Sequence, residues 1–93
     1  MHKRSKWIFM KQETVNIKHL LPITRETAAR IASAASRYES TFTMEHGNSV
    51  LNLKSMLGLL SQVLPQDGQV ILTTDGQDER QAMEAVLPIF TRQ

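Results

Sequence analysis

The fold class is decided by one stretch of the chain, Val50-Leu51-Asn52-Leu53-Lys54-Ser55-Met56-Leu57-Gly58-Leu59. Residues 49–53, Ser49-Val50-Leu51-Asn52-Leu53, are predicted to form a strand. A short and very apolar run then follows Ser55, a residue type that is favoured at helix N-termini, so we expect a helix over residues 56–64. The chain therefore passes from a strand into a helix within a few residues.

A second strand precedes this stretch. Residues 41–45 alternate, with Phe42 and Met44 on one face, and His46-Gly47-Asn48 is a turn sequence. Two predicted strands joined by such a turn predict a β-hairpin.

The first third of the chain predicts a strand, a loop and a helix. Val15 and Ile17 share one face of a strand that starts near Gln12. Pro22 keeps residues 19–23 out of a helix or a central strand. Thr24 is a good N-cap for a helix over residues 24–38. This helix is expected to bury one stripe, Ala28, Ile31, Ala32 and Ala35.

The last third predicts a turn at residues 65–68, a strand over residues 69–74 and a helix over residues 79–90. Asp78 is the expected cap of this helix. Pro88 conflicts with a regular helix, so we expect a kink or an early end near Leu87. The expected core stripe is Ala82, Ala85, Val86 and Ile89.

These elements follow the order β-α-β-β-α-β-α, for which a four-stranded sheet with the helices on one face is the natural α+β solution. The length of 93 residues fits one domain. We assign residues 10–93 to this single domain and residues 1–9 to a basic N-terminal extension.

Several function classes are excluded by composition. The chain has no cysteine, which excludes disulfide scaffolds, thiolate metal sites and cysteine nucleophiles. Its longest apolar runs fall short of the ~20 residues of a transmembrane helix, and residues 7–10 are too few for a secretion signal. We expect a cytoplasmic protein. Neither the three histidines nor the four glycines match a catalytic triad, a metal site or a phosphate loop, so we expect no enzyme, no metal and no cofactor.

Positive charge is concentrated at the N-terminus. Lys3, Arg4, Lys6 and Lys11 occur before the first acidic residue, whereas the rest of the chain has seven basic residues against nine acidic ones. A basic arm for nucleic acid is one interpretation, and a solvated terminus is the other. We favour the second and expect no direct nucleic-acid partner and no membrane partner.

The central stretch, residues 50–59, resembles the regulatory-serine segment of HPr, the phosphocarrier protein of the sugar phosphotransferase system. Ala35-Ser36-Arg37-Tyr38 is similar to the end of the first helix of that family, and Gly76-Gln77-Asp78-Glu79 to the start of its last helix. These stretches stay in register without gaps, and the resemblance covers residues 10–90. It implies an HPr-like open-faced β-sandwich, in which a four-stranded antiparallel sheet carries three helices on one face.

The chain departs from the family at the phosphoryl-accepting motif, Gly-Ile-His-Ala-Arg-Pro-Ala. In the same register it reads Pro22-Ile23-Thr24-Arg25-Glu26-Thr27-Ala28. Thr24 stands at the position of the phosphoryl-accepting histidine, and Glu26 at that of an arginine that helps to hold the phosphoryl group. A carboxylate repels the anion that a guanidinium binds. The resemblance therefore implies a divergent, Crh-like member that lacks the catalytic histidine.

One alternative preserves carrier activity. His19-Leu20-Leu21-Pro22 has the His-x-x-Pro spacing of the motif, which would make His19 the acceptor. This register requires five extra residues between the loop and Ser55, and Leu21 then takes the place of the arginine. The alternative is an active phosphocarrier between Enzyme I and sugar-specific components.

A regulatory role is carried onto Ser55 by the resemblance, because an HPr kinase/phosphorylase modifies the corresponding serine in many Firmicute members. Phosphate at a helix N-terminus gains from the helix dipole and from free N–H groups. The following helix has more apolar residues than one buried stripe needs, and an exposed apolar patch usually marks an interaction site. The docking residues implied for the kinase and other partners are Lys54, Met56, Leu57 and Leu60.

The leading interpretation is a non-catalytic regulatory paralogue that is phosphorylated at Ser55 and acts by protein–protein binding in carbon catabolite control. Its partners would be HPr kinase/phosphorylase and a catabolite-control type regulator or a metabolic enzyme. A pure interaction module is a further alternative. The apolar patch would then form a homodimer, or the segment Trp7-Ile8-Phe9 would fold back and cover it.

Overall fold

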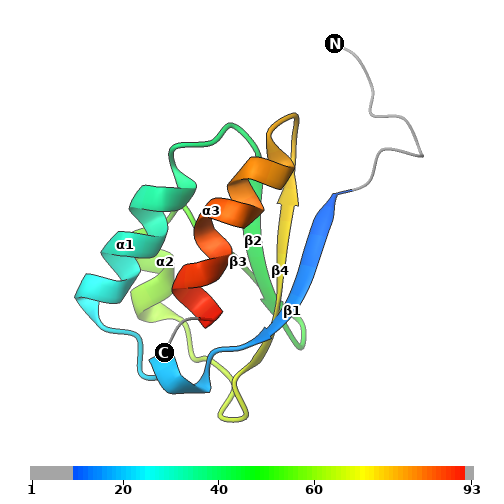
Figure 1. Ribbon diagram of the computed structural model, residues 1–93. Helices are drawn as coiled ribbons and strands as arrows, with labels where there is room; N and C mark the ends of the chain where they lie inside the picture. Colours follow the sequence, from blue (N-terminus) through cyan, green and yellow to red (C-terminus); the bar gives the residue numbers. More distant parts are fainter. Residues whose placement is uncertain (1–9, 92–93) are drawn as a thin grey trace.

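The computed structural model describes residues 10–91, which form the predicted α+β arrangement (Figure 1). Four strands form one antiparallel sheet in the order β1-β4-β2-β3, and the helices cover one of its faces. The element bounds are β1 Lys11–Asn16, η1 Lys18–Leu20, α1 Arg25–Ala35, β2 Thr41–His46, β3 Ser49–Asn52, α2 Met56–Ser61, β4 Gln69–Asp75 and α3 Glu79–Thr91. The predicted fold class and element order are thereby confirmed.

Alternation along the strands produces the core. In β2, β3 and β4 alternate residues face the helices and are buried, while Val50 and Ile71 on the open face are exposed. In β1 only Val15 is buried, and in β4 Thr73 is buried as well. The buried residues of the sheet side are Val15, Ile17, Phe42, Met44, Leu51, Leu53, Val70 and Leu72. The predicted stripe of α1 packs against them, with all four members buried.

The helix ends differ from the prediction. The α-helical part of α1 ends at Ala35, and the chain continues to Tyr38 in turns whose N–H groups bond three residues back. The second helix, α2, ends at Ser61 because Gln62 is already extended. Pro65 explains this early end, since a proline disfavours helical backbone at the residue before it and the helix cannot extend to Leu64.

The last helix contradicts two predictions. It runs through Pro88 to Thr91, so the early end near Leu87 is wrong. Proline has no N–H to donate to the carbonyl of Glu84, and Glu84 lies at an exposed position of the helix. The core stripe is also rotated: Ala85 is exposed, while the larger Met83 and Phe90 are buried.

Gly68 fixes the position of the segment that leads to α1. Its φ of 77° lies in the left-handed region, and its carbonyl accepts a hydrogen bond from the Ile17 N–H at 2.8 Å. A Cβ at this position would lie 2.6 Å from the backbone nitrogen of Lys18. Only glycine therefore allows η1 to approach the turn before β4 so closely.

Asp78 joins the α1–β2 loop to the start of α3. The sequence predicts this residue as a helix cap, but its carboxylate accepts hydrogen bonds from the Glu39 N–H and the Ser40 N–H, each at 2.9 Å, and from the Ser40 hydroxyl. Ser40 is buried. The Ser40 hydroxyl, followed by the Glu39 N–H, holds the pKa of the Asp78 carboxyl below its ordinary value.

We predict that Asp78→Asn destabilises the fold at neutral pH. The amide NH2 cannot accept a hydrogen bond, so at least one of the donors of Glu39 and Ser40 loses its acceptor. Since folding lowers the pKa of Asp78, its contribution is complete above the unfolded-state value of ~3.9 and is lost as the pH falls through the folded-state value. Urea unfolding at several pH values should show that the wild-type advantage shrinks in acid. Glu84→Gln, at an exposed position, is the control. A constant advantage down to strong acid would contradict the assignment.

Candidate functional site

Thr24 begins α1 and uses its hydroxyl as a helix cap. Its Oγ1 accepts a hydrogen bond from the Thr27 N–H at 3.1 Å and donates one to the Thr27 hydroxyl oxygen, also at 3.1 Å. The predicted N-cap is therefore confirmed. Thr24, Arg25 and Glu26 are all exposed, and the Glu26 carboxylate lies in the positive first turn of the helix, where the dipole stabilises it. An approaching anion meets a carboxylate here.

His19, the alternative acceptor, lies on η1 and is exposed. It comes before the cis peptide bond between Leu21 and Pro22 and does not belong to the first turn of α1. Its imidazole makes no hydrogen bond to any other residue in the range 10–91. The structure thus separates His19 from the backbone N–H groups that begin α1.

Ser55 is the N-cap of α2, as predicted. Its Oγ accepts a hydrogen bond from the Gly58 N–H at 3.0 Å, and its carbonyl accepts one from the Leu59 N–H at 3.1 Å. The side chain is half-buried. A Cβ on Gly58 would lie 3.2 Å from this Oγ and 3.1 Å from Leu51, so the glycine makes room for the serine hydroxyl.

Lys54 is held in place from both ends. Its N–H donates to the Asn52 side-chain oxygen at 2.9 Å, and its Nζ donates to the Tyr38 carbonyl oxygen at 2.7 Å. The second bond joins the segment before α2 to the turn after α1. It places a fixed positive charge in the residue next to the Ser55 hydroxyl.

An apolar patch surrounds Ser55, as the sequence predicts. Leu57 is 78% exposed, Leu60 40% and Val63 85%, while Leu59 is buried and anchors the helix to the core. Met56 is half-buried. We call the exposed residues Leu57, Leu60 and Val63 the α2 patch. Exposed apolar residues of this kind are the feature on which the predicted docking role rests.

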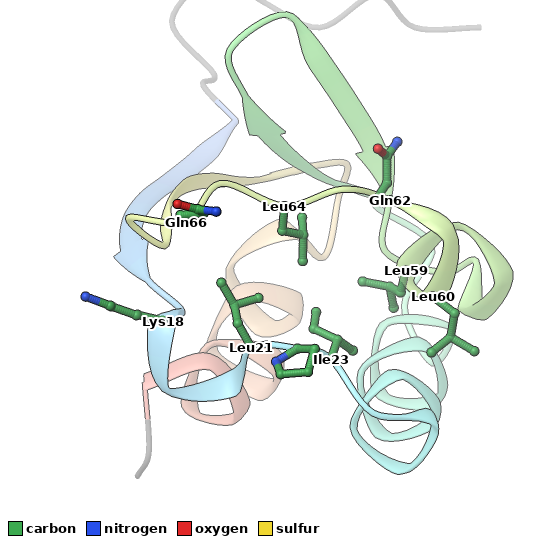
Figure 2. A pocket seen from close by; sticks show the side chains of 9 residues that line it. Lys18, Leu21, Ile23, Leu59, Leu60, Gln62, Leu64 and Gln66 are labelled. Carbon is green, nitrogen blue, oxygen red and sulfur yellow. The ribbon is translucent and has the colours of Figure 1, made fainter.

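Beside the α2 patch lies a cavity of about 520 Å³ that the sequence analysis did not foresee. It opens between residues 18–23 and the segment 59–66, and Leu60 forms part of its rim. Figure 2 shows Leu21, Ile23, Leu59 and Leu64 pointing toward one another, while Lys18 and Gln62 point away. The walls are therefore apolar. The cavity forms where residues 18–23 pack near residues 59–66, two segments that are distant in the sequence. A local sequence pattern therefore does not predict it.

Neither a metal centre nor a membrane span is found in the described part of the chain. No three His, Asp or Glu residues within residues 10–91 are grouped closely enough to hold a metal ion. None of the helices in this range has the length and hydropathy needed to cross a bilayer.

Known proteins share this architecture. The sequence model of the family described as the PTS HPr component phosphorylation site matches residues 8–92. The chain is 29% identical over 84 residues to the HPr-like protein Crh of Halalkalibacterium halodurans, covering 90% of this chain and 100% of that protein.

Solved structures agree with this match. HPr-C-His of Thermoanaerobacter tengcongensis superposes with a TM-score of 0.77 and 31% identity, over 87% of this chain and 91% of that one. Crh of Bacillus subtilis, whose crystal structure is a dimer with a swapped domain, has a TM-score of 0.67 and 21% identity over 97% and 92% of the two chains. The second likeness concerns the fold alone.

The sheet order, the helices on one face and these matches define a protein of the phosphocarrier class, whose members are carriers rather than enzymes. The chain belongs to the HPr family of the phosphotransferase system, and its match to Crh confirms the predicted Crh-like character. The individual site residues, Thr24, Glu26, Lys54 and Ser55 among them, stay predictions.

We predict that Ser55→Ala lowers the free energy of unfolding by about 1 kcal/mol, because the Gly58 N–H loses its acceptor. Ser55→Asp retains an acceptor and should cost much less. Urea unfolding measures both variants. Ser61→Ala is a control in the same helix, where the exposed hydroxyl makes one long bond of 3.4 Å to the Gly58 carbonyl. Equal losses for Ser55→Ala and Ser55→Asp would contradict the capping role.

Proposed function

We propose that this chain is a non-catalytic regulatory member of the HPr family, phosphorylated at Ser55 and acting by protein–protein binding in carbon catabolite control. The observation that carries the proposal is the contrast between its two helix caps. The Thr24 hydroxyl both accepts and donates a hydrogen bond, and the exposed Glu26 follows it in the first turn of α1. The Ser55 hydroxyl accepts one hydrogen bond, follows the ordered Lys54 and precedes the α2 patch.

Loss of the carrier reaction follows from the chemistry of Thr24 and Glu26. A phosphohistidine passes its phosphoryl group on readily, whereas a threonine phosphate is a stable ester. The Thr24 hydroxyl donates a hydrogen bond to the Thr27 hydroxyl oxygen. The neighbouring Glu26 carboxylate repels a phosphoryl group where an arginine would attract it. By itself, then, the chain is neither a carrier nor an enzyme.

Phosphorylation at Ser55 is compatible with the local structure. The Ser55 oxygen attacks the γ-phosphorus of ATP, ADP leaves, and the hydroxyl proton passes to a base of the kinase. The new phosphate oxygens can accept the Gly58 N–H in place of the hydroxyl, and the preceding residue, Lys54, carries an ammonium that is bonded to the Tyr38 carbonyl. Modification therefore changes the charge of the surface without removing the helix cap.

The partners of this surface would be HPr kinase/phosphorylase and a catabolite-control type regulator or a metabolic enzyme, all in the cytoplasm. Lys54, Met56, Leu57 and Leu60 are the proposed docking residues. An apolar surface with one fixed cation supports a protein partner, and a phosphate at its centre changes which partner fits.

The test is the intact mass of the full chain after incubation with ATP and the HPr kinase/phosphorylase of the source organism. One phosphate should be added and map to Ser55; it should be absent from Ser55→Ala and present on Ser61→Ala, the matched control in the same helix. That organism's ordinary HPr is the positive control for the kinase. An unmodified chain beside a fully phosphorylated control would overturn the proposal.

A further inference from the structure

The apolar cavity beside α2 shares only Leu60 with the docking residues proposed above. It lies between residues 18–23 and the segment 59–66, and its Leu21, Ile23, Leu59 and Leu64 side chains converge on one space (Figure 2). Its volume of about 520 Å³ lies within the range of pockets that hold a ligand or a partner's side chain. We propose that this cavity binds the segment Trp7-Ile8-Phe9 of a second copy of the chain.

The chemistry of the segment fits the cavity. Trp7-Ile8-Phe9 is a run of three large apolar residues that includes the chain's single tryptophan. It lies outside the described residues and precedes β1. Large aromatic side chains supply most of the energy where one protein anchors in a pocket of another. The cavity matches this chemistry because no charged side chain points into it; Lys18 extends away from it in Figure 2.

The length of the chain before β1 determines whether Trp7-Ile8-Phe9 can enter the cavity of its own copy or only that of a second copy. Lys18 and Gln66 line the cavity near the end of the sheet where Asn16 pairs with Gln69, whereas Met10 precedes the opposite end, where Lys11 pairs with Thr74 (Figure 1). The six residues of β1 span about 20 Å. Trp7 is three residues before Met10, a reach of about 10 Å at full extension. The segment therefore falls short of its own cavity.

The distribution of charge also favours association of the N-terminal segment with a second copy. Residues 1–11 carry four basic residues and no acidic one, while residues 12–93 have seven basic and nine acidic residues. The basic segment of one copy is thus attracted to the mildly acidic body of another, which assists their encounter. The proposal does not depend on Ser55 and stands or falls separately from the proposed function.

The fluorescence of Trp7 reports directly on this contact. Emission of the full-length chain should shift to the blue between micromolar and millimolar concentration, together with a monomer-to-dimer change in sedimentation, because binding follows mass action. No shift at any concentration would overturn the proposal. A shift that is present at every concentration while the chain sediments as a monomer would place the segment in its own copy and would also overturn it.

Two variants of one helix distinguish the cavity from the α2 patch, because Leu60 belongs to both and Leu57 belongs to the patch alone. Leu60→Glu puts a charge on the rim and should weaken dimerisation at least about tenfold, whereas Leu57→Glu, the same change outside the cavity, should leave it nearly unchanged. Equal loss in both variants would assign the dimer to the patch and contradict the proposal. The double variant Trp7→Ala with Phe9→Ala changes residues outside the described range and should abolish dimerisation in sedimentation, while urea unfolding should show a fold as stable as the wild type.

Discussion

Burial of one face of the sheet beneath three helices is the interaction on which the other features of this protein depend. Alternate side chains of four strands fill the interior, and Leu59 is the single residue by which α2 is buried in it. Met56 is half-buried against this core, while Leu57 and Leu60 are exposed. The same packing brings residues 18–23 opposite α2, and the gap between them is the apolar cavity. Both proposed interaction surfaces are thus consequences of how a short helix covers a sheet.

Two helix caps give the protein its chemical character. Each is a hydroxyl side chain that accepts a backbone N–H three residues later. Thr24 also donates a hydrogen bond to the Thr27 hydroxyl, and Glu26 follows it two residues later, whereas Ser55 follows Lys54, whose ammonium is bonded to the Tyr38 carbonyl. Similar cap geometry therefore occurs next to an acidic residue in one case and next to a basic residue in the other, and the proposed function rests on this contrast.

Features that depend on neighbours in the chain were predictable from the sequence. Local patterns predicted the helix caps Thr24 and Ser55, and the structure confirms both. They also predicted the burial of Phe42 and Met44 on one face of a strand and the exposed apolar residues of α2, which are confirmed as well. Features set by distant segments were not. The partners of the Asp78 carboxylate lie 38 and 39 residues away. Met83 is buried while Ala85 is exposed, and the cavity joins segments that are far apart in the sequence.

The central claim is that the phosphoryl-transfer centre of this family member is lost. Its most direct test is the intact mass of the full chain after incubation with phosphoenolpyruvate and Enzyme I, with the ordinary HPr of the source organism as the positive control. The account predicts an unmodified chain beside a fully labelled control. An acid-labile phosphate on the chain, mapped to His19, would mean that the carrier reaction survives on η1 and would contradict the account.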